Sequence, residues 1–273
     1  MLQNTRVGFI GGGVMCEAII RGMLQAGVAS ANLITASDPL ENRRNDLRTR
    51  YGIVTTRQNA AAAAGAEVIV LAVKPQQAQT VLKELREAVR PTALIVSIMA
   101  GVTIGTMSAA IGADQPIVRV MPNTPAQIGE GASGWTATRS VTMEQRQQTE
   151  AMLSALGKHA YFDNEHYIDM VTGVSGSGPA FVFLFIEAYM DAAVRIGIPR
   201  AVAEMLVLQT VKGSTLYLEQ SKLHPAALRN QVTSAGGTTA AGLHALEAGA
   251  LRATIENAVE AAFLKSEELG RLS

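Results

Sequence analysis

The sequence predicts an α/β domain followed by an all-α domain. From the N-terminus to about residue 165, short apolar stretches with strand character alternate with helical patterns. Strands that alternate with helices form a parallel sheet with helices on both faces. Beyond about residue 165 the strand character fades and long helical patterns remain. We therefore expect an α/β domain over residues 1–165 and a helical domain over residues 166–273.

The composition indicates a globular chain and excludes several kinds of partner. The 273 residues include 23 basic and 23 acidic ones, so the net charge favours neither nucleic acid nor an acidic membrane surface. Cys16 is the single cysteine, which excludes an intrachain disulfide framework and indicates a reducing compartment. No signal peptide is visible, and the apolar run from Pro179 stops at Glu187, short of the roughly 20 residues of a membrane span. We expect a soluble, cytoplasmic protein.

A glycine-rich turn follows the first expected strand, residues 6–10. It reads Gly11-x-Gly13-x-x-Cys16 and leads into a helical pattern. Gly11 permits the tight turn, Gly13 lets the backbone approach a pyrophosphate, and the free N–H groups at the helix start favour its charge. The same turn also suits an ordinary strand-to-helix connection. The second strand that follows, "NLITASD", favours a dinucleotide-binding Rossmann domain.

The end of the second strand is expected to meet the ribose next to the adenine. Asp38 follows Ser37 there, and Arg43 and Arg44 come soon after. An acid at this position bonds the ribose hydroxyl of NAD, whereas nearby arginines hold the 2′-phosphate of NADP. Since both features occur, the choice between NADH and NADPH stays open. Solvated helix residues are the alternative interpretation of the two arginines.

Three further apolar stretches predict strands. They read "AEVIVLAVKPQQ", "ALIVSIMAGVT" and "QPIVRVMPNTPAQIG", with helical patterns between them such as residues 76–90. Ligands of such sheets bind at the carboxyl ends of the strands. The residues at those ends are Lys74, Pro75, Ala100, Gly101, Asn123 and Thr124. We expect them near the cofactor, and an ordinary turn is the competing interpretation of each end.

The helical half opens with a glycine-serine loop, expected over residues 173–178, after which Pro179 suits the first turn of a helix. That helix is apolar nearly all round. Its charges form one stripe, made by Glu187, Asp191 and Arg195. Such a helix needs burial on most sides, so we expect a partner subunit; the centre of a monomeric bundle is the alternative. Two further helices are expected over residues 200–219 and 250–269.

A second glycine loop, "VTSAGGTTAAGL", precedes another helical pattern. Gly236 and Gly237 permit backbone conformations closed to other residues. Thr238 and Thr239 suit the N-cap of the helix that follows. Free N–H groups, two hydroxyls and the positive end of a helix dipole together predict a site for a small carboxylate. A plain helix cap is the simpler alternative.

Five motifs together resemble those of the Δ1-pyrroline-5-carboxylate reductase family. They read "GFIGGGVM", "AVKP", "MPNTPA", "GVSGSGPAF" and "SAGGTTAAGL", in the family's order from residue 8 to residue 243. The resemblance implies an N-terminal Rossmann domain and a helical domain that interleaves with a partner subunit. It also implies NAD(P)H-dependent reduction of a cyclic imine to L-proline, the last step of proline biosynthesis. The expected assembly is a homodimer within a larger homo-oligomer.

The resemblance also assigns roles to matching positions. The cofactor positions are Gly11, Gly13, Val14, Met15, Ser37, Asn59, Ala72, Val73, Lys74, Pro75 and Ala100. The substrate positions are Ser234, Gly236, Gly237, Thr238 and Thr239. Thr239 matches the threonine proposed to donate a proton or a hydrogen bond to the ring nitrogen. Three residues depart from the family pattern without removing a reacting group, namely Cys16, Met99 and Ala235.

Two other functions compete with this interpretation. A 3-hydroxyacid dehydrogenase of similar architecture would need a catalytic lysine early in the helical domain, and no lysine lies between Lys158 and Lys212. A non-catalytic, NAD(P)-binding redox sensor would keep the first glycine turn but would not need the second loop. No His, Cys and Asp cluster has metal-ligand spacing, so no metal is expected. His166, His224 and His244 are expected to be caps or surface residues.

Overall fold

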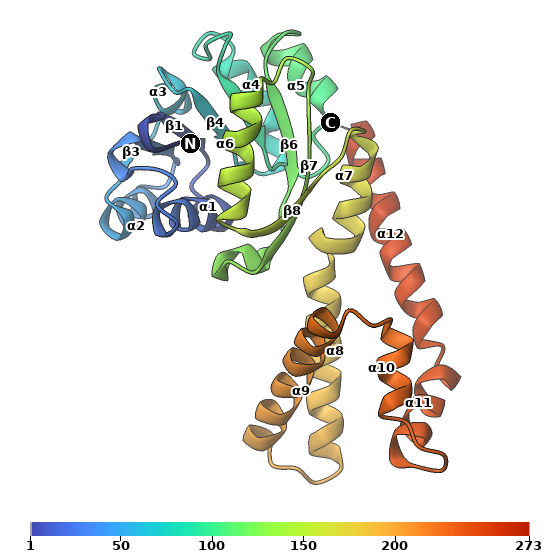
Figure 1. Ribbon diagram of the computed structural model, residues 1–273. Coiled ribbons are helices and arrows are strands. Elements are labelled where there is room, and N and C mark those ends of the chain that lie inside the picture. The colour runs from blue at the N-terminus through green and yellow to red at the C-terminus, as the bar shows by residue number, and fades with distance from the viewer. Residues whose placement is uncertain (1, 273) are drawn as a thin grey trace. The chain divides into compact units, whose positions relative to one another are not determined.

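The computed structural model describes residues 2–272, which divide into two compact units (Figure 1). The first unit comprises Met1–Ser177 with Ala261–Ser273, and the second comprises Gly178–Glu260. The end of the chain therefore returns to the α/β unit. The expected boundary between the two domains, at residues 165 and 166, stays a prediction. The division into compact units describes a single chain and does not test where a dimerisation domain begins.

The first unit contains a sheet of eight strands. The strands are β1 (Val7–Ile10), β2 (Ile34–Ser37), β3 (Val54–Thr56), β4 (Val68–Leu71), β5 (Leu94–Ser97), β6 (Ile117–Met121), β7 (Gly131–Ala137) and β8 (Gly157–Tyr161). Their order is β3-β2-β1-β4-β5-β6-β7-β8. The expected Rossmann sheet is confirmed, with all pairs parallel except β6 and β7. The strands β3, β7 and β8 were not expected from the sequence.

Helices follow most strands of the first unit, and all of them except α7 connect two strands of the sheet. They are α1 (Val14–Gln25), α2 (Glu41–Tyr51), α3 (Asn59–Ala63), α4 (Ala78–Leu85), α5 (Ile104–Ile111), α6 (Met143–Ser154) and α7 (His166–Val171). Short 3-10 turns include η3 (Pro75–Gln77) and η4 (Thr124–Ile128). The helix expected over residues 76–90 is thus a 3-10 turn followed by the shorter helix α4.

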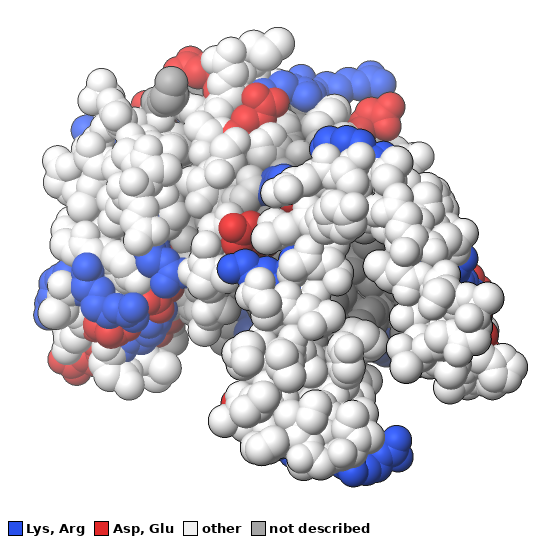
Figure 2. All heavy atoms as spheres, turned by 60° about the horizontal axis from the view of Figure 1, so that its bottom comes forward, with Lys and Arg blue, Asp and Glu red and all other residues white. Residues whose placement is uncertain are grey.

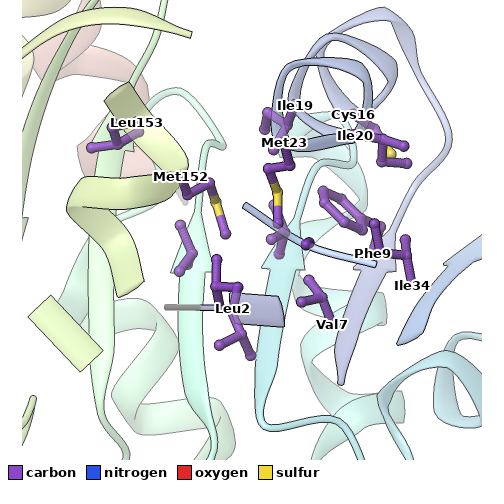
Figure 3. Close-up of a cluster of buried hydrophobic side chains, with 14 of the residues drawn as sticks. Leu2, Val7, Phe9, Cys16, Ile19, Ile20, Met23, Ile34, Met152 and Leu153 are labelled. Atoms are coloured by element: carbon purple, nitrogen blue, oxygen red, sulfur yellow. The ribbon is translucent and has the colours of Figure 1, made fainter. Parts of the chain in front are cut away.

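Two buried apolar clusters cover the two faces of the sheet. One joins β1 and its neighbours to α1 and α6, and Figure 3 shows Ile19 and Met23 of α1 against Phe9 of β1, with Met152 of α6 in the same cluster. The other joins the sheet to α3, α4 and α5. Burial on both faces explains why the central strands are mostly apolar in sequence. The sheet is therefore a rigid frame for the loops at its carboxyl edge.

The helix α7 continues through a π-helical turn, η5 (Thr172–Gly176), towards α8 (Gly178–Arg195). The loop expected over residues 173–178 is therefore wrong. Hydroxyls stabilise the wide turn, since Ser175 Oγ donates to the carbonyl of Val171 at 3.2 Å. A Cβ at Gly176 would lie 2.6 Å from the Met121 methyl carbon, so a side chain there would require Met121 to move. Glycine and serine here mark a π turn, a feature that often occurs at functional sites.

The joined helix His166–Arg195 is also longer than the apolar run read from the sequence. Within residues 2–272, it is the one helix long and apolar enough to cross a membrane, and 11% of its most apolar window is buried in this chain. The second unit contains α8 with α9 (Arg200–Ser221), α10 (Pro225–Gln231), α11 (Thr238–Ala248) and the first part of α12 (Leu251–Leu272). The expected helices over 200–219 and 250–269 are confirmed.

Candidate functional site

The glycine turn between β1 and α1 has the geometry of a phosphate-binding loop. Gly11 has φ +95°, and a Cβ there would lie 2.8 Å from the carbonyl oxygen of Ala72. Gly13 precedes α1, and a Cβ there would meet no atom within 4 Å. Open space therefore lies above the backbone at the start of a helix, where N–H groups lack partners within the helix. This loop fits the pyrophosphate of a dinucleotide.

Cys16 lies on the inner side of α1, in the position of the third small residue of the turn. Its side chain is fully buried in the cluster of α1 and β1. Burial raises the pKa of the thiol, and it is therefore a packing residue rather than a nucleophile.

The carboxyl ends of β4 and β6 enclose a pocket of about 310 Å³. It is lined by Met15, Ala72, Val73, Lys74, Ile98, Met121, Pro122, Asn123, Thr124 and Gly176. Six of these were expected near the cofactor: Met15, Ala72, Val73, Lys74, Asn123 and Thr124. Three other residues expected at the strand ends, Pro75, Ala100 and Gly101, are not among the lining residues. Asn123 has a structural task, because its Oδ1 accepts a hydrogen bond from the N–H of Ala132 at 2.9 Å.

At the end of β2, Ser37 is fully buried. Its hydroxyl donates to Asn59 Oδ1 at 2.8 Å, and Asn59 Nδ2 donates to Glu84 at 2.8 Å. Two residues expected at the cofactor are thus bonded to each other. Asn59 is half-buried and is therefore the more accessible of the two.

Asp38, the next residue, faces the glycine turn. Its Oδ2 accepts from the N–H of Gly12 at 3.0 Å, and its Oδ1 accepts from the N–H of Leu40 at 2.9 Å. A Cβ on Gly12 would lie 3.1 Å from this carboxylate. The acid is thereby fixed beside the phosphate loop.

Arg43 and Arg44 are engaged with the protein rather than solvated, so that alternative is wrong. Arg43 donates to the carbonyl of Gly12 and pairs with Glu17 and Asp46. Arg44 Nη1 donates to the carbonyls of Asp38 and Pro39 at 2.7 and 2.9 Å.

Glu17 on α1 is the centre of an ionic cluster with α2. It accepts a hydrogen bond from the Tyr51 hydroxyl and pairs with Arg43 and Arg50. Burial opposes its ionisation, but the hydrogen bonds from Tyr51 and Arg43 and the two positive charges outweigh burial and lower the pKa of Glu17. The cluster holds α2 against α1 next to the loop.

In the second unit, the second glycine loop ends at the start of α11. Gly237 is the N-cap and makes no side-chain cap, and Thr238 is the first helical residue. The expected threonine caps are therefore wrong, since both threonines lie inside the first turn. Gly236 has φ +70°, and a Cβ on Gly237 would lie 2.4 Å from Ser234 Oγ. The loop needs both glycines and leaves the two threonine hydroxyls without a hydrogen-bond partner among the described residues.

The sequence did not single out Arg119, which lies in β6 and is 1% exposed. It pairs with Glu165 and Asp169 at 2.9 Å each, and Ser266 of α12 donates to the same Asp169. A lone arginine inside the apolar strand "IVRVM" was the available signal. The network fastens α7 and the end of α12 to the sheet.

Two of the three histidines named above have partners, and His244 is exposed in α11. His224 Nδ1 accepts from the N–H of Ala226 and caps α10, as expected, and His166 lies 3.5 Å from Glu267. No group of three or more His, Cys, Asp or Glu side chains that could hold a metal ion occurs within residues 2–272.

Comparison with known families matches both parts of the chain. Residues 165–269 match the model described as pyrroline-5-carboxylate reductase dimerisation. Residues 6–101 match the model described as NADP oxidoreductase, coenzyme F420-dependent. The helix His166–Arg195 lies within the dimerisation match, which explains its exposed apolar surface by contact with another protein chain.

Individual relatives cover nearly the whole chain. The pyrroline-5-carboxylate reductase of Synechocystis sp. is 42% identical over 98% of this chain and 100% of its own length. That of Pseudomonas aeruginosa is 41% identical over 98% of both. The structure of the enzyme from Coxiella burnetii has a TM-score of 0.90 at 35% identity and covers 97% of this chain and 98% of its own. The Plasmodium falciparum pyrroline carboxylate reductase, solved with NADP bound, has a TM-score of 0.91 at 32% identity and covers 99% and 100%.

Proposed function

Because this chain belongs to the pyrroline-5-carboxylate reductase family, we propose a role for each of its two glycine loops. The chain catalyses NAD(P)H-dependent reduction of Δ1-pyrroline-5-carboxylate to L-proline, the last step of proline biosynthesis. The first loop holds the cofactor and the second holds the substrate. The observation that carries this division is the presence of two separate helix starts, each preceded by glycines that a side chain would obstruct or strain.

The cofactor residues follow the carboxyl edge of the sheet. Gly11, Gly13 and Val14 bind the pyrophosphate at the start of α1, where backbone N–H groups face open space. Met15 and the β4 end residues Ala72, Val73, Lys74 and Pro75 lie beside the nicotinamide, together with Ala100. Asn59 reaches the adenosine end, and buried Ser37 positions it through their hydrogen bond. The cofactor supplies the hydride when bound.

The substrate residues are Ser234, Gly236, Gly237, Thr238 and Thr239. The N–H groups at the start of α11 and the positive end of its dipole bind the carboxylate of the substrate. No side-chain charge is needed for this. The ring is then fixed so that its imine carbon can accept the hydride in a near-attack geometry.

Thr239 is the proposed catalytic residue. A protonated imine accepts hydride far better than a neutral one, because positive charge on nitrogen makes the neighbouring carbon electrophilic. The Thr239 hydroxyl, partly exposed in the first turn of α11, bonds the ring nitrogen as the nitrogen gains its proton. A threonine is a weak acid, so its first task is orientation and its second is proton supply.

The test replaces Thr239 with valine, which keeps the shape and removes the hydroxyl. We expect turnover to fall about tenfold or more, in the range of one lost transition-state hydrogen bond, with cofactor affinity unchanged. Thr239→Ser, which retains the hydroxyl, is the matched control and should keep most of the activity. Unchanged turnover in the valine variant removes Thr239 from the mechanism.

The family assigns the helical region to dimerisation, and the chain pairs with a second copy through it. Large apolar side chains of α8 are exposed in the single chain, and Figure 2 shows a broad uncharged surface on the helices that come forward in that view. Assembly of dimers into a larger homo-oligomer and residence in the cytoplasm are part of the proposal. The larger assembly follows from the resemblance, and the cytoplasmic location follows from the single cysteine, which indicates a reducing compartment.

A further inference from the structure

We propose that Asp38 selects NADH over NADPH in this chain. The inference rests on the proposed cofactor site and adds a specificity to it. The two cofactors differ only in the 2′-phosphate on the ribose next to the adenine. That ribose lies at the end of β2, between the glycine turn and the residues that follow Ser37.

The carboxylate of Asp38 is fixed at this place by the backbone. The N–H of Gly12 binds one oxygen at 3.0 Å and the N–H of Leu40 binds the other at 2.9 Å. Each carboxylate oxygen can accept more than one hydrogen bond, so both remain able to accept a ribose hydroxyl. The acid is held by the same loop that holds the pyrophosphate, and it therefore cannot withdraw without disturbing that loop.

A 2′-phosphate would bring about 1.5 to 2 negative charges next to this fixed carboxylate. Arg43 and Arg44 are the arginines closest in sequence that could compensate this charge. Arg43 already pairs with Glu17 and Asp46 and donates to the carbonyl of Gly12. Its charge is therefore balanced within the protein.

Arg44 is the other candidate. Its Nη1 donates to the carbonyls of Asp38 and Pro39, which holds one edge of the guanidinium against the backbone. The 2′-phosphate of NADPH would face the fixed carboxylate of Asp38, and the charge of Arg43 is already neutralised. Its binding free energy is therefore less favourable than that of the ribose hydroxyls of NADH. Like charges placed together cost enough to decide specificity.

Equilibrium binding tests the proposal without turnover. Dissociation constants for NADH and NADPH are measured by fluorescence titration on the full-length protein, and the ratio between them isolates the effect of the 2′-phosphate. We expect NADH to bind at least about tenfold more tightly in the unmodified protein, as expected for one like-charge contact. Asp38→Ser should lower that ratio about tenfold by improving NADPH binding.

Two further variants make the outcome specific. Glu41→Gln removes the same charge from an exposed position near Asp38 and should leave the ratio unchanged. Arg44→Ala tests the alternative that Arg44 binds the 2′-phosphate. If it does, this variant should lose affinity for NADPH but not for NADH. Tighter binding of NADPH than of NADH to the unmodified protein overturns the inference. So does an Asp38→Ser variant whose ratio of dissociation constants equals that of the unmodified protein. Failure to bind either cofactor would instead overturn the proposed cofactor site.

Discussion

Gly11 and Gly13 belong to one turn but are required for different physical reasons. Gly11 has a positive φ and lies against the carbonyl of Ala72, so a side chain there is strained within the protein itself. Gly13 has ordinary dihedral angles and open space above it. The first glycine is therefore needed for the fold, and the second for the ligand.

Alanine at each position separates these two requirements. Gly11→Ala should lower the free energy of unfolding by about 1–2 kcal/mol or more, the cost of a left-handed residue with a clash added. Gly13→Ala should leave stability within about 0.5 kcal/mol and weaken cofactor binding about tenfold or more, because the methyl group occupies the approach of the pyrophosphate. Urea denaturation and cofactor titration measure the two effects. A stable Gly13→Ala protein with full cofactor affinity would contradict the placement of the phosphates.

The buried cation Arg119 joins β6 to α7 and α12. Arg119→Met should lower the free energy of unfolding by about 3 kcal/mol, because Glu165 and Asp169 lose their partner in a mostly buried position. The exposed Arg139→Met is the control and should change stability by less than about 0.5 kcal/mol. Denaturant unfolding checks both. Equal effects of the two substitutions would show that the network does not hold these elements together.

The pairing of α1 with α2 should depend on pH through Glu17. Its pKa is lowered in the folded state, so its contribution is present above the unfolded pKa of about 4.3 and is lost as pH falls through the folded value. Glu17→Gln should therefore cost about 1–2 kcal/mol above about pH 5, and the difference from the unmodified protein should shrink in more acidic solution. Unfolding curves between about pH 3 and pH 7 measure this gap. If the stability difference between the unmodified protein and Glu17→Gln grew as the pH fell, Glu17 would not stabilise the fold through its ionised form.

Elements with a strong apolar period were predictable, and those defined by contacts were not. The strands β1, β4, β5 and β6 are buried on both faces, so their sequences are apolar except for a few residues such as Arg119. The strand β8 lies at the edge of the sheet and is mostly exposed. The strand β7 next to it is mostly buried, but its sequence is rich in small and polar residues. The sequence predicted a loop in place of the π turn because glycine and serine usually indicate loops. The hydrogen bond from the Ser175 hydroxyl to the carbonyl of Val171 can be seen only in the structure.

The same division holds at the site. The two glycine loops could be found from spacing, because glycine at a turn has a fixed local meaning. The hydrogen bond from Gly12 to Asp38 and the ion pair of Arg43 with Glu17 each join residues 26 positions apart, so the sequence left the cofactor choice open. Thr238 and Thr239 were expected as caps but are the first and second residues of the helix, because cap and first-turn positions differ only in backbone dihedral angles.

At the scale of the whole molecule, the apolar surface of α8 requires a partner chain. Phe183 is 62% exposed in the single chain. Phe183→Asp should raise the dissociation constant of the dimer at least about tenfold, since a charge would enter an apolar interface. Glu187→Gln, on the charged stripe of the same helix, should not. Sedimentation measures both, and an unaltered dimer in the aspartate variant would exclude this part of α8 from the interface.

The central claim is that this chain transfers hydride from a nicotinamide cofactor to a cyclic imine. The most direct measurement follows the absorbance of reduced cofactor after Δ1-pyrroline-5-carboxylate is added, with NADH and NADPH in parallel. The account predicts substrate-dependent oxidation that yields L-proline, faster with NADH at limiting cofactor. No oxidation with either cofactor, by a protein that binds one of them, would contradict it.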